Sequence, residues 1–486
     1  MLKLIKNKYL WLGLILLGAF VVRLYKIGSP IADWHSWRQA DTASVSKVYV
    51  EKGINLLYPR YQDVSSIQTG ISNPEGYRFV EFPVYNAAHA LLAKAFPTFS
   101  LEVWGRLLSI FCALASTVLL FWLGQRFIGG LGGLLAAFFF AFIPYNIYFS
   151  RVILPEPMGV TFGLLAIALF VKFIDSGKNI NLYAGGVAFA IALLIKPFTI
   201  FYGVPLLYLA IKKYSLETII KKANVLISFL IFADIVIVPL LLWRGWLTNY
   251  PIGVPFFEWA FNGDGIRFRP AFWRWIFAER LGALILGIWG VTIFVLGILT
   301  KVKNNSFIRL FLLGMFFYVS TIATANVRHD YYQIFIIPAV SLALAQGADY
   351  LVRSKSFSKA ISWGVLGFSV LMMLSMGWYK IKEYYKINHP EIIEAGRAVD
   401  ELTEKDALIV APYNGDTAFL YQTGRWGWPA IDNSIDNIIF RGADYYVSVT
   451  PGDADTQMIV KRFEVIKEAS NYIIADLHKP KKGIAK

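Results

Sequence analysis

The segment 32–43, ADWHSWRQADTA, contains two aspartates, one histidine, one arginine and two tryptophans within twelve positions. It follows the first hydrophobic segment of the chain directly. Ionisable groups are costly to bury near a bilayer, so such a cluster beside a membrane segment indicates a functional site. An amphipathic interfacial helix anchored by Trp34 and Trp37 is the structural alternative. We interpret the segment as the centre of a site.

Within this segment, His35, Arg38 and Asp41 follow one another at a spacing of three, so consecutive members are neighbours on a helix. Asp33 precedes that helix and is suited either to cap it or to act in the site. A carboxylate that a nearby cation keeps ionised can take the proton of an incoming hydroxyl. Asp33, Asp41 and His35 are therefore candidate catalytic residues.

Further polar and aromatic residues lie at the ends of other hydrophobic segments. Glu81 comes just before a helix that Pro83 opens, where a carboxylate gains from the helix dipole. A lysine at the depth of Lys196 needs an anionic partner, either a carboxylate or a bound phosphate, and we favour the phosphate. The other candidates for substrate binding are Tyr85, Glu156, His329, Asp330, Tyr331, Tyr332, Arg425 and Trp428.

The composition is that of an integral membrane protein. Of the 486 residues, 57% are hydrophobic and 16% are charged, whereas soluble domains average about 25% charged. The net charge of +15 comes from short basic clusters between apolar stretches, which is typical of membrane orientation rather than nucleic-acid binding. The single cysteine, Cys112, excludes disulfides within the chain and cysteine-based metal sites. No phosphate-binding glycine motif indicates a nucleotide.

By length and apolarity the sequence predicts about eleven spans: roughly 8–26, 101–123, 128–149, 156–174, 180–196, 197–212, 223–243, 281–300, 306–326, 333–351 and 359–379. Basic clusters, such as Lys3, Lys6 and Lys8 or Lys301 and Lys303, occupy alternate connections and predict that these are cytoplasmic. The other connections carry the Trp, His, Asp and Arg residues, so we expect the N-terminus in the cytoplasm and the active site on the extracytoplasmic face.

Two regions of ordinary polarity flank these spans. The loop 27–100 predicts juxtamembrane helices over 36–52, closed by Gly53, and over 83–95. The tail 381–486 predicts a small extracytoplasmic α/β domain with a helix near 390–404 and strands at 408–413, 445–450 and 471–476. We therefore expect a membrane domain over 1–380 and a second domain over 381–486.

The motifs together resemble the GT-C class of membrane glycosyltransferases, in particular the protein O-mannosyltransferase and aminoarabinose-transferase superfamily. The resemblance covers roughly 8–380 and rests on segment 32–43, EFP at 81–83, SR at 150–151, KP at 196–197 and HDYY at 329–332. It implies inverting transfer of a sugar from a polyprenyl-phosphate donor to a lipid, glycan or protein acceptor in the cell membrane. A carboxylate after the first span would act on the acceptor. Arg38, Arg151 and Lys196 would hold the carrier phosphate without a metal.

The sequence departs from this superfamily at two positions. The catalytic aspartate of the aminoarabinose transferases falls on His35, and the lysine that follows their glutamate is Phe82 here. We expect Asp33 or Asp41 to be the base, with His35 orienting it or sharing its proton. No cofactor is expected to be required, although Asp33, His35 and His329 are a possible divalent-metal set. The alternative functions are a lipid-linked sugar flippase or transporter, and an oligosaccharide transferase or ligase that uses diphosphate carriers.

Overall fold

The computed structural model describes residues 7–300 and 305–481, so the predicted cytoplasmic cations Lys3, Lys6, Lys301 and Lys303 lie outside the described residues. The chain divides into two compact units. Unit 1 comprises residues 1–27, 106–245 and 257–384, and unit 2 comprises residues 28–105, 246–256 and 385–486. The predicted division into domains at 380/381 stays a prediction. The first loop, however, clusters with the tail and not with the helices that surround it in sequence.

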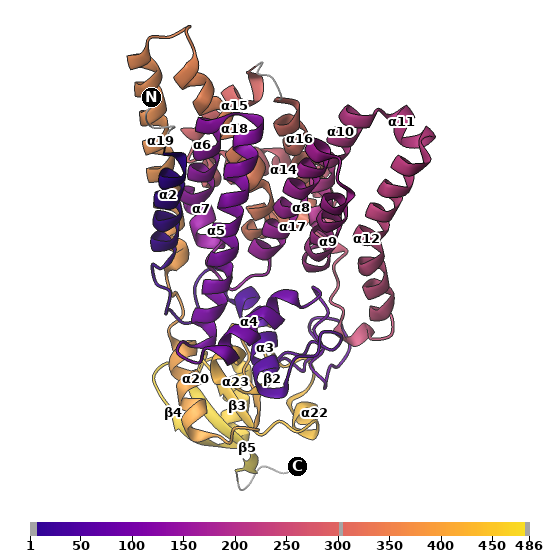
Figure 1. The fold of residues 1–486 in the computed structure, drawn as a ribbon. Helices are drawn as coiled ribbons and strands as arrows, with labels where there is room; N and C mark the ends of the chain where they lie inside the picture. The colour runs from indigo at the N-terminus through magenta and orange to yellow at the C-terminus, as the bar shows by residue number, and fades with distance from the viewer. Residues whose placement is uncertain (1–6, 301–304, 482–486) are drawn as a thin grey trace. The chain divides into compact units, whose positions relative to one another are not determined.

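Unit 1 is helical, and each of the eleven predicted apolar segments contains helix in the described residues (Figure 1). Its longer helices are α2 Lys8–Arg23, α5 Leu101–Phe127 (which begins in unit 2), α6 Gly130–Phe142, α8 Glu156–Ser176, α9 Asn179–Ile195, α10 Gly203–Tyr214, α12 Ala223–Leu247, α15 Gly290–Leu299, α16 Asn305–Thr321, α18 Ile337–Arg353 and α19 Lys359–Ile381. Shorter helices connect them: α7 Pro144–Phe149, η1 Pro197–Tyr202, α11 Leu216–Lys221, α13 Trp259–Asn262, η3 Ile266–Phe268, α14 Pro270–Arg274, the π-helix η4 Trp275–Ile285, α17 Ala323–Arg328, η5 Asp330–Ile336 and η6 Lys382–Tyr385.

Within the described ranges 7–300 and 305–481, five helical segments are long and apolar enough to cross a membrane by themselves. A sixth results if one bent pair counts as a single span. That pair, Pro270–Ile285 and Gly290–Leu299, bends by 116°. The bend coincides with two consecutive residues of positive φ, Gly287 at 48° and Ile288 at 64°, and a left-handed backbone cannot continue a right-handed helix. The chain is a multi-pass membrane protein, while the total of eleven spans stays a prediction.

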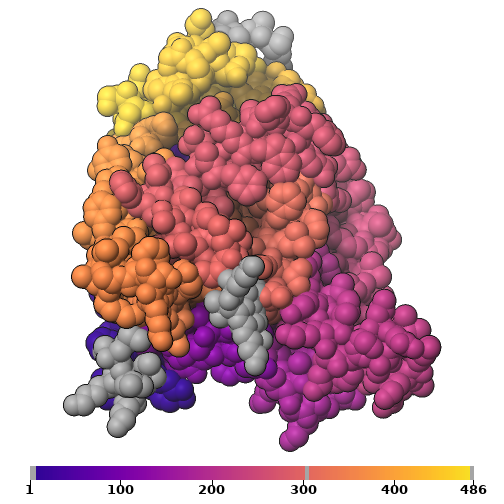
Figure 2. All heavy atoms as spheres, turned by 90° about the horizontal axis from the view of Figure 1, so that it is seen from above, coloured from indigo at the N-terminus to yellow at the C-terminus, as the bar shows by residue number. Residues whose placement is uncertain are grey.

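Close helix contacts in unit 1 depend on glycine. A Cβ on Gly297 of α15 would lie 1.9 Å from the carbonyl oxygen of Ala343 in α18, and one on Gly347 would lie 1.9 Å from that of Ile293. Small residues of this kind let membrane helices approach backbone to backbone. By contrast, α12 is poorly covered by other helices, since only 6% of its most apolar 18-residue stretch is buried. Helices α10 and α11, drawn in magenta, lie at one edge of unit 1 (Figures 1 and 2).

Unit 2 combines the two juxtamembrane helices with a small α/β domain. The first loop forms α3 Ser36–Lys52 and α4 Val84–Ala95, and Gly53 ends α3 at a φ of +92°, as predicted. The tail has a five-stranded sheet in the order β2-β1-β3-β5-β4. β1 is parallel to β2 and β3, and β5 is antiparallel to β3 and β4. The elements are η2 Pro251–Gly253, α20 Glu391–Leu402, β1 Leu408–Val410, α21 Thr417–Thr423, β2 Trp426–Trp428, α22 Ile435–Phe440, β3 Tyr445–Ser448, α23 Ala454–Arg462, β4 Phe463–Glu468 and β5 Ile473–Pro480.

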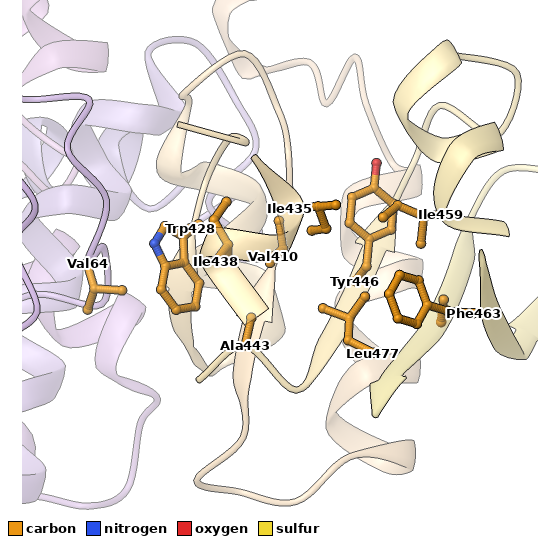
Figure 3. Close-up of a cluster of buried hydrophobic side chains, with 11 residues drawn as sticks. Val64, Val410, Trp428, Ile435, Ile438, Ala443, Tyr446, Ile459, Phe463 and Leu477 are labelled. Carbon is orange, nitrogen blue, oxygen red and sulfur yellow. The ribbon is translucent and has the colours of Figure 1, made fainter. Parts of the chain in front are cut away.

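The first loop completes the edge and the core of this sheet. The amide of Val64 donates to the carbonyl of Gly427 at 2.9 Å, and the amide of Gly427 donates to that of Gln62 at 3.0 Å. Val64 also belongs to the buried cluster around Trp428 and Val410 (Figure 3). The three predicted strands of the tail are confirmed as β1, β3 and β5, whereas β2 and β4 were not predicted.

Candidate active site

The helix that carries the central motif, α3, begins at Ser36. Its N-cap residue His35 has a left-handed backbone with a φ of 55°, and the His35 side chain makes no capping hydrogen bond. Asp33 lies two residues before this N-cap position, and whether it caps the helix stays a prediction. Its Oδ1 accepts a hydrogen bond from Nε2 of Gln39 at 2.7 Å, and the same amide lies 3.3 Å from the carbonyl of Trp34. The side chain of Gln39, in the first turn of α3, therefore reaches back to residues 33 and 34, and its neutral amide orients the Asp33 carboxylate.

Two ion pairs of opposite polarity join α3 to the strand-like segment before α4. Arg38 pairs with Glu81, and Asp41 pairs with Arg78 at 2.5 Å. Residues three apart share a face of a helix, and the same spacing separates the two partners in the loop. Arg78 and Glu81 of the loop thus meet charges of the opposite sign on α3. These two ion pairs fix the register between the loop and the helix.

Asp41 is enclosed within unit 2. Its side chain is 1% exposed, and its second oxygen accepts a hydrogen bond from Oγ1 of Thr417 at 2.7 Å. Asp416 precedes this threonine and caps α21 through the amide of Ala418. Burial raises the pKa of Asp416 to about 6, and the nearby charge of Asp41 acts in the same direction. Through its contacts with Arg78 and Thr417, Asp41 therefore links the first loop to the tail domain.

Three further candidates contact neighbours within unit 2. The Tyr85 hydroxyl donates to the carbonyl of Gly105 at 2.8 Å. The Arg425 guanidinium, 2% exposed, donates to Asp400 at 2.7 Å and to the carbonyl of Glu404 at 2.7 Å. Trp428 is 1% exposed within the sheet core (Figure 3). Substrate binding by these side chains stays a prediction, and their observed contacts stabilise the fold of unit 2.

In unit 1, the Lys196 ammonium lies 3.1 Å from a carboxylate oxygen of Glu156. Glu156 opens α8, where the helix dipole favours a negative charge, and Lys196 occupies the junction between α9 and η1. Both side chains are buried, and the ring of Tyr332 is 6.0 Å from the ammonium. The anionic partner of Lys196 in the structure is thus a carboxylate, while its contact with a phosphate stays a prediction.

The HDYY segment forms a second polar cluster in unit 1. Asp330 accepts a hydrogen bond from the hydroxyl of Tyr384 at 2.5 Å and lies 3.4 Å from Arg280. The ring of Tyr331 stacks on Tyr332 at 4.5 Å and on His329 at 5.7 Å. The structure therefore brings Lys196, Glu156 and the whole segment 329–332 into one neighbourhood.

Arg280 and Tyr384 were missed from the sequence. Arg280 lies in the π-helix η4, immediately before a segment predicted to be a span, and Tyr384 lies beyond the end of the last predicted span. A charged or hydroxyl side chain at the end of an apolar segment is usually an interfacial residue, so the signal was present but not specific.

Arg151 lies in the turn before α8 and donates to the carbonyl of Tyr25 at 2.5 Å.

The described residues contain no cluster of side chains of the kind that holds a resident metal ion. Among residues 7–300 and 305–481 there is no group of three or more His, Cys, Asp or Glu side chains that could hold one. The predicted set of Asp33, His35 and His329 draws two members from unit 2 and one from unit 1. Metal binding by this set stays a prediction.

Comparison with solved structures shows the fold. The chain matches ArnT from Cupriavidus metallidurans bound to undecaprenyl phosphate over 96% of its own length and 97% of ArnT, with a TM-score of 0.65 and 11% identity. It matches the Archaeoglobus fulgidus oligosaccharyltransferase in complex with zinc and sulfate over 91% of its own length and 68% of that chain, with a TM-score of 0.54 and 9% identity.

The chain has the GT-C fold. Residues 83–243 also match the family described as dolichyl-phosphate-mannose-protein mannosyltransferase. No curated protein matches the sequence. The predicted fold class, an α-helical GT-C membrane protein with a small C-terminal α/β domain, is confirmed, and so is the resemblance inferred from the motifs.

Proposed function

We propose that this GT-C protein is an inverting glycosyltransferase that moves a sugar from a polyprenyl-phosphate donor to an acceptor on the extracytoplasmic face. The observation that carries the proposal is the fold match to ArnT over 96% of this chain, because that structure is described with undecaprenyl phosphate bound. The match of residues 83–243 to a family named for a lipid-phosphate sugar donor supports the same donor class.

In the proposed reaction, Asp33 takes the proton of the acceptor hydroxyl. The hydroxyl oxygen forms a bond to the anomeric carbon of the donor, and the bond from that carbon to the phosphate oxygen breaks. Attack from the side opposite the phosphate inverts the anomeric centre. Asp33 suits this role because the Gln39 amide orients its carboxylate at 2.7 Å, and an amide donor does not neutralise a carboxylate.

Asp41 suits the role less well. One of its oxygens is paired with Arg78, and the other accepts a hydrogen bond from Thr417. A carboxylate enclosed in this way has no oxygen directed at an incoming hydroxyl. We therefore assign the proton transfer to Asp33, the orientation of the acceptor to His35, and a structural role to Asp41.

The leaving lipid phosphate gains negative charge as the bond breaks, so cations that lie close to it accelerate the reaction. We assign this role to Arg151 and Lys196. The buried Lys196 ammonium lies 3.1 Å from a carboxylate oxygen of Glu156. The ring of Tyr332 lies 6.0 Å from the ammonium and 6.4 Å from the ring of His329, and we assign this aromatic pair to the sugar.

The experiment is to reconstitute the purified protein with a panel of polyprenyl-phosphate sugars and an extract of envelope acceptors. We expect consumption of one lipid-linked sugar, loss of consumption in Asp33→Asn, and a product of inverted anomeric configuration by NMR. A donor that crosses the bilayer with its sugar still attached would instead identify a flippase and refute transfer.

The fold match to the archaeal oligosaccharyltransferase favours one second candidate, an oligosaccharide transferase. For this candidate we infer a polyprenyl-diphosphate carrier, which is the alternative donor class considered from the sequence. The same panel separates the two, because it contains matched monophosphate and diphosphate donors. Consumption of the diphosphate donor alone, with dependence on an added divalent cation, would support this second candidate.

A further inference from the structure

A pocket of about 650 Å³ lies wholly within unit 2, between α3, the first loop and the start of β2. No residue of the proposed catalytic set lines it, and of the substrate-binding candidates only Arg425 forms part of its wall. Ligand pockets for small molecules have volumes of roughly 300–1,000 Å³, so the space is sufficient for two or more sugar rings. Its charged lining residues are Lys47, Glu51, Lys52, Arg60, Glu75, Asp400, Lys405, Asp406 and Arg425.

The charges of this pocket nearly balance, with five cations and four carboxylates. Arg60 pairs with Glu75 at 2.7 Å, and Asp400 pairs with Lys405 at 2.6 Å and with Arg425 at 2.7 Å. A pocket for a polyanion would carry a clear excess of cations. Closely spaced carboxylates and ammonium groups instead supply acceptors and donors to a ligand that has both in each unit, as a hydroxylated ring does.

An aromatic face forms part of the same wall. Trp426 is half-buried, and the ammonium of Lys52 lies 4.1 Å from the centre of its ring. Lys52 is exposed, so its long side chain can move off the ring at little cost. The apolar C–H face of a sugar ring packs on an indole while its hydroxyls reach the surrounding charges.

An extended peptide fits this pocket less well. Peptides commonly add to a free sheet edge, but the edge strand β2 is already bonded at Gly427 to Gln62 and Val64 of the first loop. Apart from Trp426, the apolar lining consists of Pro74, Ala407 and Leu408. This surface lacks deep apolar subsites for peptide side chains.

We propose that this pocket binds an oligosaccharide of two or more rings, and that it holds the part of a glycan acceptor that does not react. The second part rests on the proposed function, whereas the binding of an oligosaccharide does not. Trp426 stacks on one ring, and Glu51, Asp406 and Lys47 bond to hydroxyls of that ring and its neighbour. The acceptor class this implies is a glycan rather than a simple lipid or a protein hydroxyl.

The test uses the full-length protein in lipid nanodiscs and saturation-transfer-difference NMR. The probes are α-1,6-mannotetraose, chitotetraose and a Gly-Ser-Thr-Gly tetrapeptide. We expect saturation of at least one tetrasaccharide, about tenfold weaker binding in Trp426→Ala, and a several-fold loss in the double variant Glu51→Gln/Asp406→Asn. The double variant keeps the experiment decisive if Trp426→Ala fails to fold, because Glu51 and Asp406 are exposed.

The matched control is Glu464→Gln, which neutralises an exposed carboxylate on β4 outside the pocket and should leave binding unchanged. Failure of both tetrasaccharides to bind, binding of the tetrapeptide alone, or equal binding by all variants would overturn the proposal. Oligosaccharide binding without consumption of any lipid-linked sugar would leave the pocket standing and refute the proposed function. Consumption whose acceptor KM is the same in the double variant would refute the acceptor role alone.

Discussion

Neutralising Asp41 and neutralising Asp33 should damage the protein in two different ways. Asp41→Asn leaves the Arg78 guanidinium, 7% exposed, without its carboxylate. Asp33→Asn keeps a carbonyl oxygen that can still accept from the Gln39 amide. The first change should therefore destabilise unit 2, and the second should abolish transfer while leaving the fold intact.

The magnitudes follow from these contacts. Removing one partner of a buried ion pair costs about 3–5 kcal/mol, because the other charge stays buried. Arg78 keeps two contacts, a hydrogen bond to Gln68 at 3.2 Å and the ring of Tyr61 at 5.1 Å, so we expect about 3 kcal/mol. For Asp33→Asn the net change in a retained hydrogen bond is under about 1 kcal/mol.

The assay combines pulse proteolysis of unit 2 in urea with consumption of the lipid-linked sugar. A double-mutant cycle with Arg78→Met isolates the ion pair, because the double variant buries neither charge. We expect Asp41→Asn/Arg78→Met to regain most of the lost stability and to keep measurable transfer. Asp33→Asn should resist proteolysis like the unmodified protein and consume no donor.

The contradicting outcome is that Asp41→Asn is as stable as the unmodified protein and lacks transfer, while Asp33→Asn retains transfer. That outcome would make Asp41 the base and Asp33 a positioning residue. Equal stability of the Asp41→Asn and double variants would also refute it, because the Arg78 charge would then cost nothing to leave without a partner.

Three further outcomes are expected. Lys196→Met should abolish transfer and lower stability, while Lys196→Met combined with Glu156→Met should restore stability alone, as judged by thermal melting and donor consumption. Burial raises the pKa of Asp63 to about 6, so its protonation stabilises the fold below pH about 4, and this stabilisation is lost as pH rises through about 6. Asp63→Asn should therefore raise the melting temperature at pH 7.5 and have little effect at pH 4.5, and equal shifts at both would contradict this. Gly297→Ala should destabilise unit 1 by several kcal/mol because its Cβ would lie 1.9 Å from a carbonyl oxygen, whereas Gly364→Ala, with nothing within 4 Å, should not.

The helical part of the fold was predictable because its signal is local. A long apolar segment between basic clusters indicates a membrane helix whatever its neighbours are. The 116° bend after η4 was not predictable, because the positive φ of Ile288 is rare for a β-branched residue and depends on packing. Strand β2 was missed because its three residues, with Gly427 in the centre, are too few to show the alternating pattern of a strand.

The candidate residues were predictable as types but not as pairs. The sequence places Arg38 three residues before Asp41 and Arg78 three before Glu81, so opposite charges at matching spacing were visible. The pairing depends on how the segment 78–81 is aligned along α3, and the loop between them determines that alignment. Thr417 lies 376 residues from Asp41, and only the folded tail domain brings the two together.

In the proposed reaction, the pairing of Lys196 with Glu156 bears on how the product leaves. A lysine without a carboxylate would bind the lipid phosphate more tightly after the bond breaks than before, because the leaving group gains charge. Glu156 opposes that gain, because its carboxylate lies 3.1 Å from the ammonium and competes with the phosphate for the same positive charge. Glu156→Gln should then speed the chemical step and slow carrier release, so that a single-turnover burst exceeds the steady-state rate. Equal burst and steady-state rates in this variant would mean that Glu156 serves only to stabilise the buried lysine.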